Sequence, residues 1–172
     1  LPRAWTRYRG LHRHGAEIAL SYEVGGTPVL EQLGMLSASQ VPPHGQPVVY
    51  RAFELGARSS ARVLQVATAP NGRFTIARDP EDRPSDSLAV AGDLVAGVHA
   101  APVGVQWRLD ASSARLVLPP GDAAERFVVW VGHAPDPAAR SALARSVREQ
   151  LDQLVKQRPE TLDLARLTRG GP

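Results

Sequence analysis

Two histidines separated by one residue, His12 and His14, are the first residues whose type and spacing could do chemistry. In a strand this spacing puts both side chains on one face, where two imidazoles could bind zinc or iron. Such a site would need a third ligand, for which the chain offers His44, His99 and His133. The alternative is that His14 and Gly15 form a hairpin turn after a strand in which His12 is a polar residue. We favour the hairpin and predict no metal site.

Paired carboxylates could in principle hydrolyse a glycosidic bond. Six acidic residues are candidates for such a pair: Glu17, Glu23, Glu31, Glu54, Asp93 and Asp110. Their spacing singles out no pair, and the chain contains neither a Gly-x-Ser-x-Gly elbow nor a glycine-rich phosphate loop. We therefore predict no catalytic residue and no cofactor in this domain, and a metal-dependent or acid/base hydrolase is the third of three functional hypotheses.

The N-terminal stretch combines aromatic and basic residues and is the best candidate for a contact surface. Its predicted ligand- or interface-binding residues are Trp5, Tyr8, Arg9, His12 and His14. The sequence leaves open whether they face a carbohydrate or a neighbouring domain.

The composition limits the remaining function classes. The chain has 172 residues, enough for one domain with a core of its own, and no cysteine, which excludes disulfides, thiolate metal sites and covalent haem attachment within it. Its net charge is +3, and the only dense group of basic residues is that of the N-terminal arginines. Nucleic-acid binders usually carry a basic patch or stripe, so nucleic acid is not an expected partner. No apolar run approaches the roughly 20 residues of a membrane span. Because it begins with Leu1 rather than methionine, we expect the chain to be a processed or excised piece of a longer protein.

Short strands separated by turn signals predict a mainly β fold, an antiparallel β-sandwich, for which a supersandwich-like arrangement is one form. Residues 17–24 alternate cleanly, with Ile18, Leu20, Tyr22 and Val24 on the apolar face of a half-buried strand. The pairs Gly25-Gly26 and Asn71-Gly72 predict hairpin turns. The other predicted strands cover residues 29–33, 48–55, 61–69, 74–77, 88–91, 94–100, 103–109, 115–118 and 126–131.

The pattern changes after residue 134, where one amphipathic helix is expected. Asp136 is a plausible N-cap and Pro137 suits the first turn, while Arg158-Pro159 should end the helix. Its apolar stripe consists of Leu143, Val147, Leu151, Leu154 and Val155. We therefore divide the chain into a sandwich (1–134), a helix that packs on the sandwich or on a neighbouring domain (135–158) and an extended exit linker (159–172).

The segment WTRYRGLHRHGAEIALSYEVGGTPVLE, residues 5–31, resembles a recurrent segment of very large exported bacterial proteins. In those proteins it is part of a domain of unknown function. The parent chains also carry propellers similar to glucose/sorbosone dehydrogenases and c-type cytochrome modules. The tail DLARLTRGGP, residues 163–172, is similar to that family's exit segment before a propeller-like region. One departure is His12, where the family more often has tyrosine.

The resemblance implies an exported setting, periplasmic or on the cell surface. It implies haem c and electron transfer for the parent protein only. The leading functional expectation is a non-catalytic sandwich that packs against a neighbouring propeller of the same chain, where it could line the substrate cleft of that propeller. The alternative is an autonomous carbohydrate-binding module. The packing hypothesis predicts an exposed apolar patch near the helix or the termini.

Overall fold

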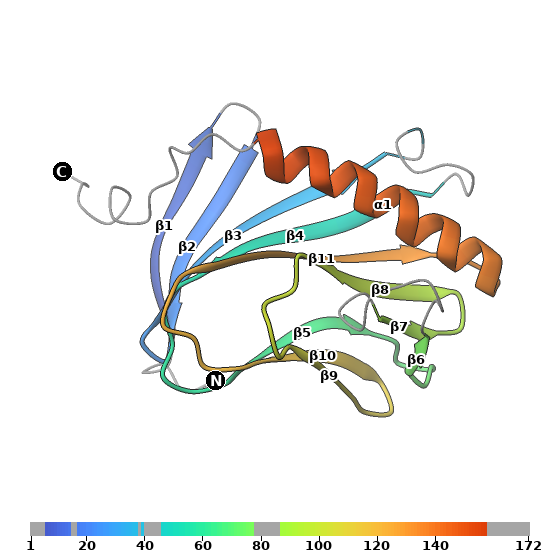
Figure 1. The fold of residues 1–172 in the computed structure, drawn as a ribbon, viewed down its shortest axis with the longest axis horizontal. Coiled ribbons are helices and arrows are strands. Elements are labelled where there is room, and N and C mark those ends of the chain that lie inside the picture. The colour runs from blue at the N-terminus through green and yellow to red at the C-terminus, as the bar shows by residue number, and fades with distance from the viewer. Residues whose placement is uncertain (1–5, 15–16, 38, 40–45, 78–86, 158–172) are drawn as a thin grey trace.

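The computed structural model describes residues 6–14, 17–37, 39, 46–77 and 87–157. This part of the chain forms eleven strands and one helix, whose arrangement is shown in Figure 1. The elements are β1 Thr6–His14, β2 Glu17–Val24, β3 Thr27–Leu36, β4 Val48–Leu55, β5 Arg62–Thr68, β6 Thr75–Ala77, β7 Leu88–Ala91, β8 Leu94–His99, β9 Gln106–Leu109, β10 Ser113–Leu118, β11 Glu125–His133 and α1 Pro137–Gln157.

The strands form two antiparallel sheets, so the predicted mainly β, sandwich-like fold with one C-terminal helix is confirmed. The large sheet has the strand order β1-β2-β3-β4-β11-β8-β7-β6, and the small sheet has the order β5-β10-β9. Figure 1 shows α1 on one side of the large sheet and the small sheet on the other. Among the described residues, no helix is long and apolar enough to cross a membrane.

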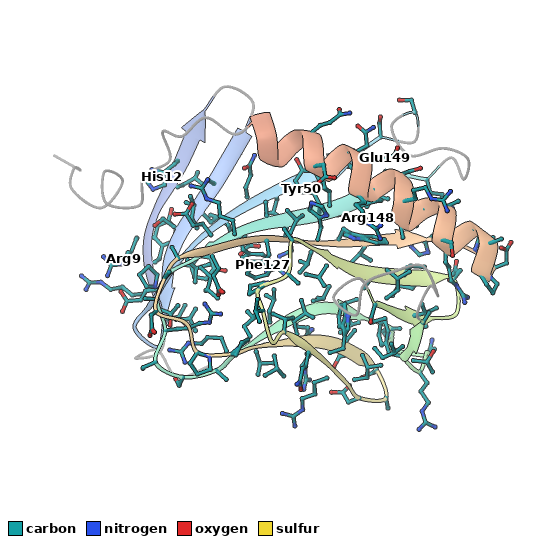
Figure 2. The ribbon with its side chains drawn as sticks, viewed as in Figure 1. Arg9, His12, Tyr50, Phe127, Arg148 and Glu149 are labelled. Carbon is teal, nitrogen blue, oxygen red and sulfur yellow. The ribbon has the colours of Figure 1, made fainter. Side chains whose placement is uncertain are left out.

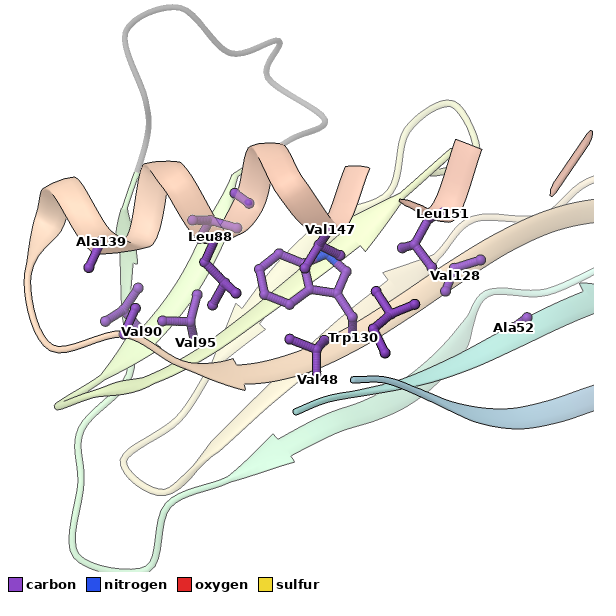
Figure 3. Close-up of a cluster of buried hydrophobic side chains, with 14 residues drawn as sticks. Val48, Ala52, Leu88, Val90, Val95, Val128, Trp130, Ala139, Val147 and Leu151 are labelled. Atoms are coloured by element: carbon purple, nitrogen blue, oxygen red, sulfur yellow. The ribbon is translucent and has the colours of Figure 1, made fainter. Parts of the chain in front are cut away.

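The helix covers an apolar core on its side of the large sheet. Val147 and Leu151 are fully buried on α1, and they pack with Trp130 of β11 and with Val48 of β4. Figure 3 shows the Trp130 indole lying between the sheet and the helix. Leu143, Val147 and Leu151 of the predicted stripe are thus buried. The side chains of Leu154 and Val155 are not among those that the structure describes.

A second core fills the space between the two sheets. Phe53 of β4 and Phe127 of β11 stack there with ring centroids 5.3 Å apart, and Leu116 and Leu118 of β10 close the core from the small sheet. Figure 2 shows Phe127 on the side of the large sheet opposite the helix. Strand β11 is therefore buried on both faces, with Phe127 toward the small sheet and Trp130 toward α1.

Two turn predictions have different outcomes. Gly25 and Gly26 both have positive φ, 53° and 79°, and connect β2 to β3 as a hairpin, as predicted. The turn before Gly72 exists, with Gly72 N donating to Ala69 O at 2.9 Å, but it is not a hairpin. It connects β5 of the small sheet to β6 of the large one, and a turn dipeptide alone does not specify whether the flanking strands pair.

The strand predicted over residues 103–109 is also shorter than expected. Gly104 has a φ of 80° and Val105 N donates to Pro102 O, so a turn precedes β9. Val103, expected on the apolar face, is 94% exposed. The favoured interpretation of His12 as a polar strand residue is confirmed, because His12 lies on β1, which pairs with β2 along its length and forms the edge of the large sheet. The bounds of this strand were not predicted, and His14 is its last residue rather than part of a turn.

The helix begins where its N-cap predicts. Asp136 Oδ1 accepts a hydrogen bond from Ala139 N at 2.8 Å, and α1 starts at Pro137 and ends at Gln157, directly before Arg158-Pro159. The predicted exit linker, residues 159–172, lies outside the described residues, as do Trp5, Gly15 and His44.

Candidate functional site

Four of the five predicted N-terminal site residues lie on β1 but do not share one face of the sheet, and the fifth, Trp5, lies outside the described residues. Tyr8 pairs with Tyr22 in register, and its side chain is 65% exposed. Arg9 lies at a bulge and forms an ion pair with Glu23, which alternates with Tyr22 and so lies on the opposite face. His12 pairs with Ala19 on that opposite face, and His14 ends the strand with a side chain outside the described ones. Figure 2 shows Arg9 and His12 at the β1 edge of the molecule.

The described histidines do not converge. His99 of β8 pairs with Asp152 of α1 at 3.2 Å, and His133 Nδ1 lies 3.3 Å from Asp93 Oδ2. No three His, Asp or Glu side chains among the described residues are grouped so that they could hold a metal ion.

The candidate carboxylates for hydrolysis are held by basic side chains. Glu31 binds Arg51 at 2.7 Å, Glu54 binds Arg126 at 2.7 Å, and Asp110 binds Arg115 at 3.1 Å. The Ser113 hydroxyl, together with the backbone N–H groups of Ser112 and Ser113, lowers the pKa of Asp110. These contacts tie strands and turns together, and they give the carboxylates a structural role in the described part of the chain.

Glu31 is the centre of a polar network on the face of the large sheet that the small sheet partly covers. Tyr22 donates its hydroxyl proton to Glu31 Oε2 at 2.7 Å, and burial, followed by this hydrogen bond, raises the pKa of Tyr22 above its ordinary value. Arg51 lies with its guanidinium carbon 4.9 Å from the centre of the Phe53 ring and donates from Nη1 to Gln65 O at 3.1 Å. Because Gln65 belongs to β5, the network marks the line at which the small sheet ends.

Beyond that line the same face of the large sheet is apolar and uncovered. In the strand pairings, Leu11 lies opposite Leu20, Leu33 opposite Arg51, and Met35 opposite Val49, so these side chains share the face of Tyr22 and Glu31. We call this surface the open face and define it by its large exposed side chains, with their exposed fractions: Tyr8 (65%), Leu11 (57%), Ile18 (49%), Leu33 (55%), Met35 (63%) and Val49 (49%).

The open face departs in part from an expectation for β2. Tyr22 and Val24 of its apolar phase pack against the core between the sheets, as expected. Ile18 of the same phase is 49% exposed, however, while Ala19 and Ser21, in the opposite phase, are 6% and 2% exposed. Alternation identified the two faces of β2 correctly, but it does not reveal that the second sheet stops at β5. Leu33, Met35 and Val49 were also missed, because a strand pattern alone does not tell which apolar phase finds a cover.

The small sheet presents an unpaired edge toward the open face. Strand β5 is the outer strand of the order β5-β10-β9, and its Gln65 carbonyl accepts from Arg51 instead of from a further strand. Below the same edge lies a cavity of about 90 Å³ between β5 and strands β2, β3 and β4. Its walls include Val24, Val29, Phe53, Leu55, Leu118 and Phe127.

Comparison with known proteins adds one match. The model of a family described as a domain of unknown function (DUF6797) matches residues 1–31. No curated protein and no solved structure matches the chain. The matched residues contain β1 and β2 and the start of β3, so the segment that is similar to this domain of unknown function also contains Tyr8, Leu11 and Ile18 of the open face.

Proposed function

We propose that this chain is a non-catalytic β-sandwich domain of a larger protein, which docks onto a neighbouring domain through the open face. The observation that carries the proposal is the run of exposed Leu11, Ile18, Leu33 and Met35 across three adjacent strands. Monomeric proteins rarely expose contiguous apolar patches larger than a few hundred Å², and larger patches usually mark interaction sites.

The energetics favour a cover of matching chemistry. Burying a large aliphatic side chain completely is worth about 1.5–3 kcal/mol, and each of these side chains is about half exposed. A partner that contributes apolar side chains over β1 to β4 would therefore gain several such increments. The small sheet covers the adjoining part of the same face in this way, because its inner side chains Leu116 and Leu118 bury Phe53.

The occupant that we propose is an apolar surface of an adjacent domain in the same polypeptide, of the propeller type that the N-terminal resemblance implies. An exported location and a haem-carrying parent belong to the same proposal. The partner segment would lie beside β5, where the second layer ends, and would continue that layer over Leu33 and Ile18.

The alternative is an autonomous carbohydrate-binding module, which would stack sugar rings on exposed aromatic side chains. Tyr8 is the feature that favours it, since its ring is 65% exposed on the open face. The other described members of the open face are aliphatic, which suits protein packing better than sugar stacking.

Hydrogen exchange separates these hypotheses. We would compare the 172-residue chain with a longer polypeptide that includes its native flanking sequence. The docking proposal expects slower exchange in β1 to β3 of the longer protein, and expects the double variant Ile18→Asp/Leu33→Asp to abolish that protection. Val103→Asp is the matched control, because Val103 is 94% exposed and lies away from the open face. Equal exchange in the two proteins would contradict docking, and sugar binding that Tyr8→Ala abolishes would favour the module.

A further inference from the structure

The cavity beneath β5 has a polar side as well as an apolar one. Arg62, at the start of β5, and Thr27, at the start of β3, both line it. Thr27 is 1% exposed, so its hydroxyl group is enclosed among the aliphatic and aromatic walls. The Arg62 guanidinium is only half-buried, so it lies at the rim of the cavity, and it reaches the buried Thr27 hydroxyl from there. A buried polar group of this kind is costly unless it is hydrogen-bonded.

The Arg62 guanidinium is held in place by neutral oxygens. Nε donates to Thr27 Oγ1 at 3.1 Å, Nη1 to Ser60 Oγ at 2.6 Å, and Nη2 to Gly25 O at 2.7 Å. Weaker contacts join Nη1 to the carbonyls of Ser60 and Ala61, each at 3.3 Å. Among the described residues none of the ion pairs includes Arg62, so its positive charge is fixed at the cavity without a carboxylate.

Two donors remain after these bonds are counted. A guanidinium has five N–H groups, and one of the two on Nη2 has no acceptor in the described part of the chain. Thr27 Oγ1 accepts from Arg62, and its own proton has no acceptor there. A carboxylate oxygen is the acceptor that suits a cationic N–H and a hydroxyl together.

From this geometry we infer that the cavity is a binding site for a small carboxylate with a compact, branched aliphatic tail. The tail occupies the apolar space between Val24, Leu55 and Phe127, and the carboxylate accepts from Arg62 and Thr27 at the rim. The cavity of about 90 Å³ is smaller than the cavity of about 150 Å³ that holds benzene, which favours a short tail.

The test titrates the isolated chain with isovalerate and follows backbone and methyl NMR signals. Two reference ligands separate the contributions: isoamyl alcohol keeps the tail without the charge, and acetate keeps the charge without the tail. We expect saturable isovalerate shifts at Val24, Leu55 and Thr27, and weaker binding of both reference ligands. An absence of saturable shifts, or equal affinity for isovalerate and isoamyl alcohol, would overturn the assignment.

Three variants assign the contacts. Arg62→Gln should weaken isovalerate about tenfold, the effect of losing one charge-assisted hydrogen bond, and leave isoamyl alcohol unchanged. Arg108→Gln removes the same charge from the exposed side of β9 and should change neither. Val24→Phe should fill the cavity and abolish binding of both ligands, with near-ultraviolet circular dichroism showing that the fold is kept. Isovalerate affinity unchanged in either Arg62→Gln or Val24→Phe would refute the site, and neither result bears on docking through the open face.

Discussion

The Trp130 indole lies flat over Gly97 of the neighbouring strand. The two residues are directly paired between β11 and β8, and a Cβ atom at Gly97 would lie less than 3.0 Å from three atoms of the indole. Gly34 has the same relationship to Tyr50, and the pairing Gly34–Tyr50–Trp130–Gly97 forms one row across four strands. Two aromatic rings thus spread outward over two glycines, and the Trp130 ring forms part of the surface on which α1 packs.

This row predicts that Gly97→Ala destabilises the fold by about 1–3 kcal/mol, the usual effect of overpacking a filled core. Urea unfolding followed by circular dichroism measures the loss. Because the clash is with the indole, the double variant Gly97→Ala/Trp130→Leu should lose less stability than the sum of the two single variants. Simple additivity would mean that the methyl group meets something other than Trp130.

A buried arginine supports a second prediction at the end of the sandwich where β4 and β10 finish. The Arg58 side chain is 0% exposed, its Nη2 donates to Glu125 Oε2 at 2.5 Å, and its Nε and Nη1 are buried without a partner in the described part of the chain. Glu125→Ala would leave this charge unpaired. We expect a loss of about 2–3 kcal/mol, less than the roughly 3–5 kcal/mol of a fully buried pair because the Glu125 side chain is 32% exposed.

The matched control for this prediction is Glu23→Ala. Glu23 pairs with Arg9, whose side chain is 35% exposed, and surface pairs of this kind contribute less than about 1 kcal/mol. Guanidinium unfolding of the two variants measures both losses side by side. Equal losses would show that the burial of Arg58 contributes nothing to the strength of its pair.

Much of this architecture can be predicted from the sequence. Residues 17–24, 48–55 and 88–91 form strands with the predicted bounds, because alternation or continuous apolar character and the flanking turn residues agree there. Asp136 and Pro137 also predict the first turn of α1, because the capping hydrogen bond joins residues only three positions apart in the sequence. The nearly continuous apolar run of β11 likewise predicts a strand that is buried on both faces.

What the sequence does not reveal depends on contacts between distant segments. The ion pairs of Glu31 and Glu54 join strands that only the sheet order brings together, so these residues remained candidates for acid/base chemistry until the fold was known. The extent of the small sheet is equally non-local. Whether Ile18 is buried depends on where β5 lies, and nothing within β2 encodes that position.

The burial of Tyr22, together with its hydrogen bond to Glu31, predicts a loss of stability in alkaline solution. The folded state holds the Tyr22 phenol protonated above its ordinary pKa of 10.0, whereas the unfolded chain releases the proton near that value. Above pH 10 the unfolded state therefore binds fewer protons, and the free energy of unfolding falls as the pH rises. Tyr22→Phe should lower stability by about 1 kcal/mol at pH 7 and make the alkaline decline shallower. Unfolding curves from pH 7 to 11 test this, and an unchanged slope in the variant would exclude Tyr22 as its cause.

Two leucines three residues apart on β3 test whether the open face is open in solution. Leu30 is 1% exposed on one side of the strand, and Leu33 is 55% exposed on the other. In the 172-residue chain, Leu30→Ala should cost about 2–5 kcal/mol, as for other buried leucines, while Leu33→Ala should change stability by less than about 0.5 kcal/mol. Thermal and urea unfolding of both variants measure the difference. If a neighbouring domain covers the open face, Leu33→Ala becomes destabilising in the longer protein, since the Leu33 side chain is then buried between the large sheet and that domain. A large loss from Leu33→Ala in the short chain would instead mean that Leu33 is already covered there, and docking through this face would lose its basis.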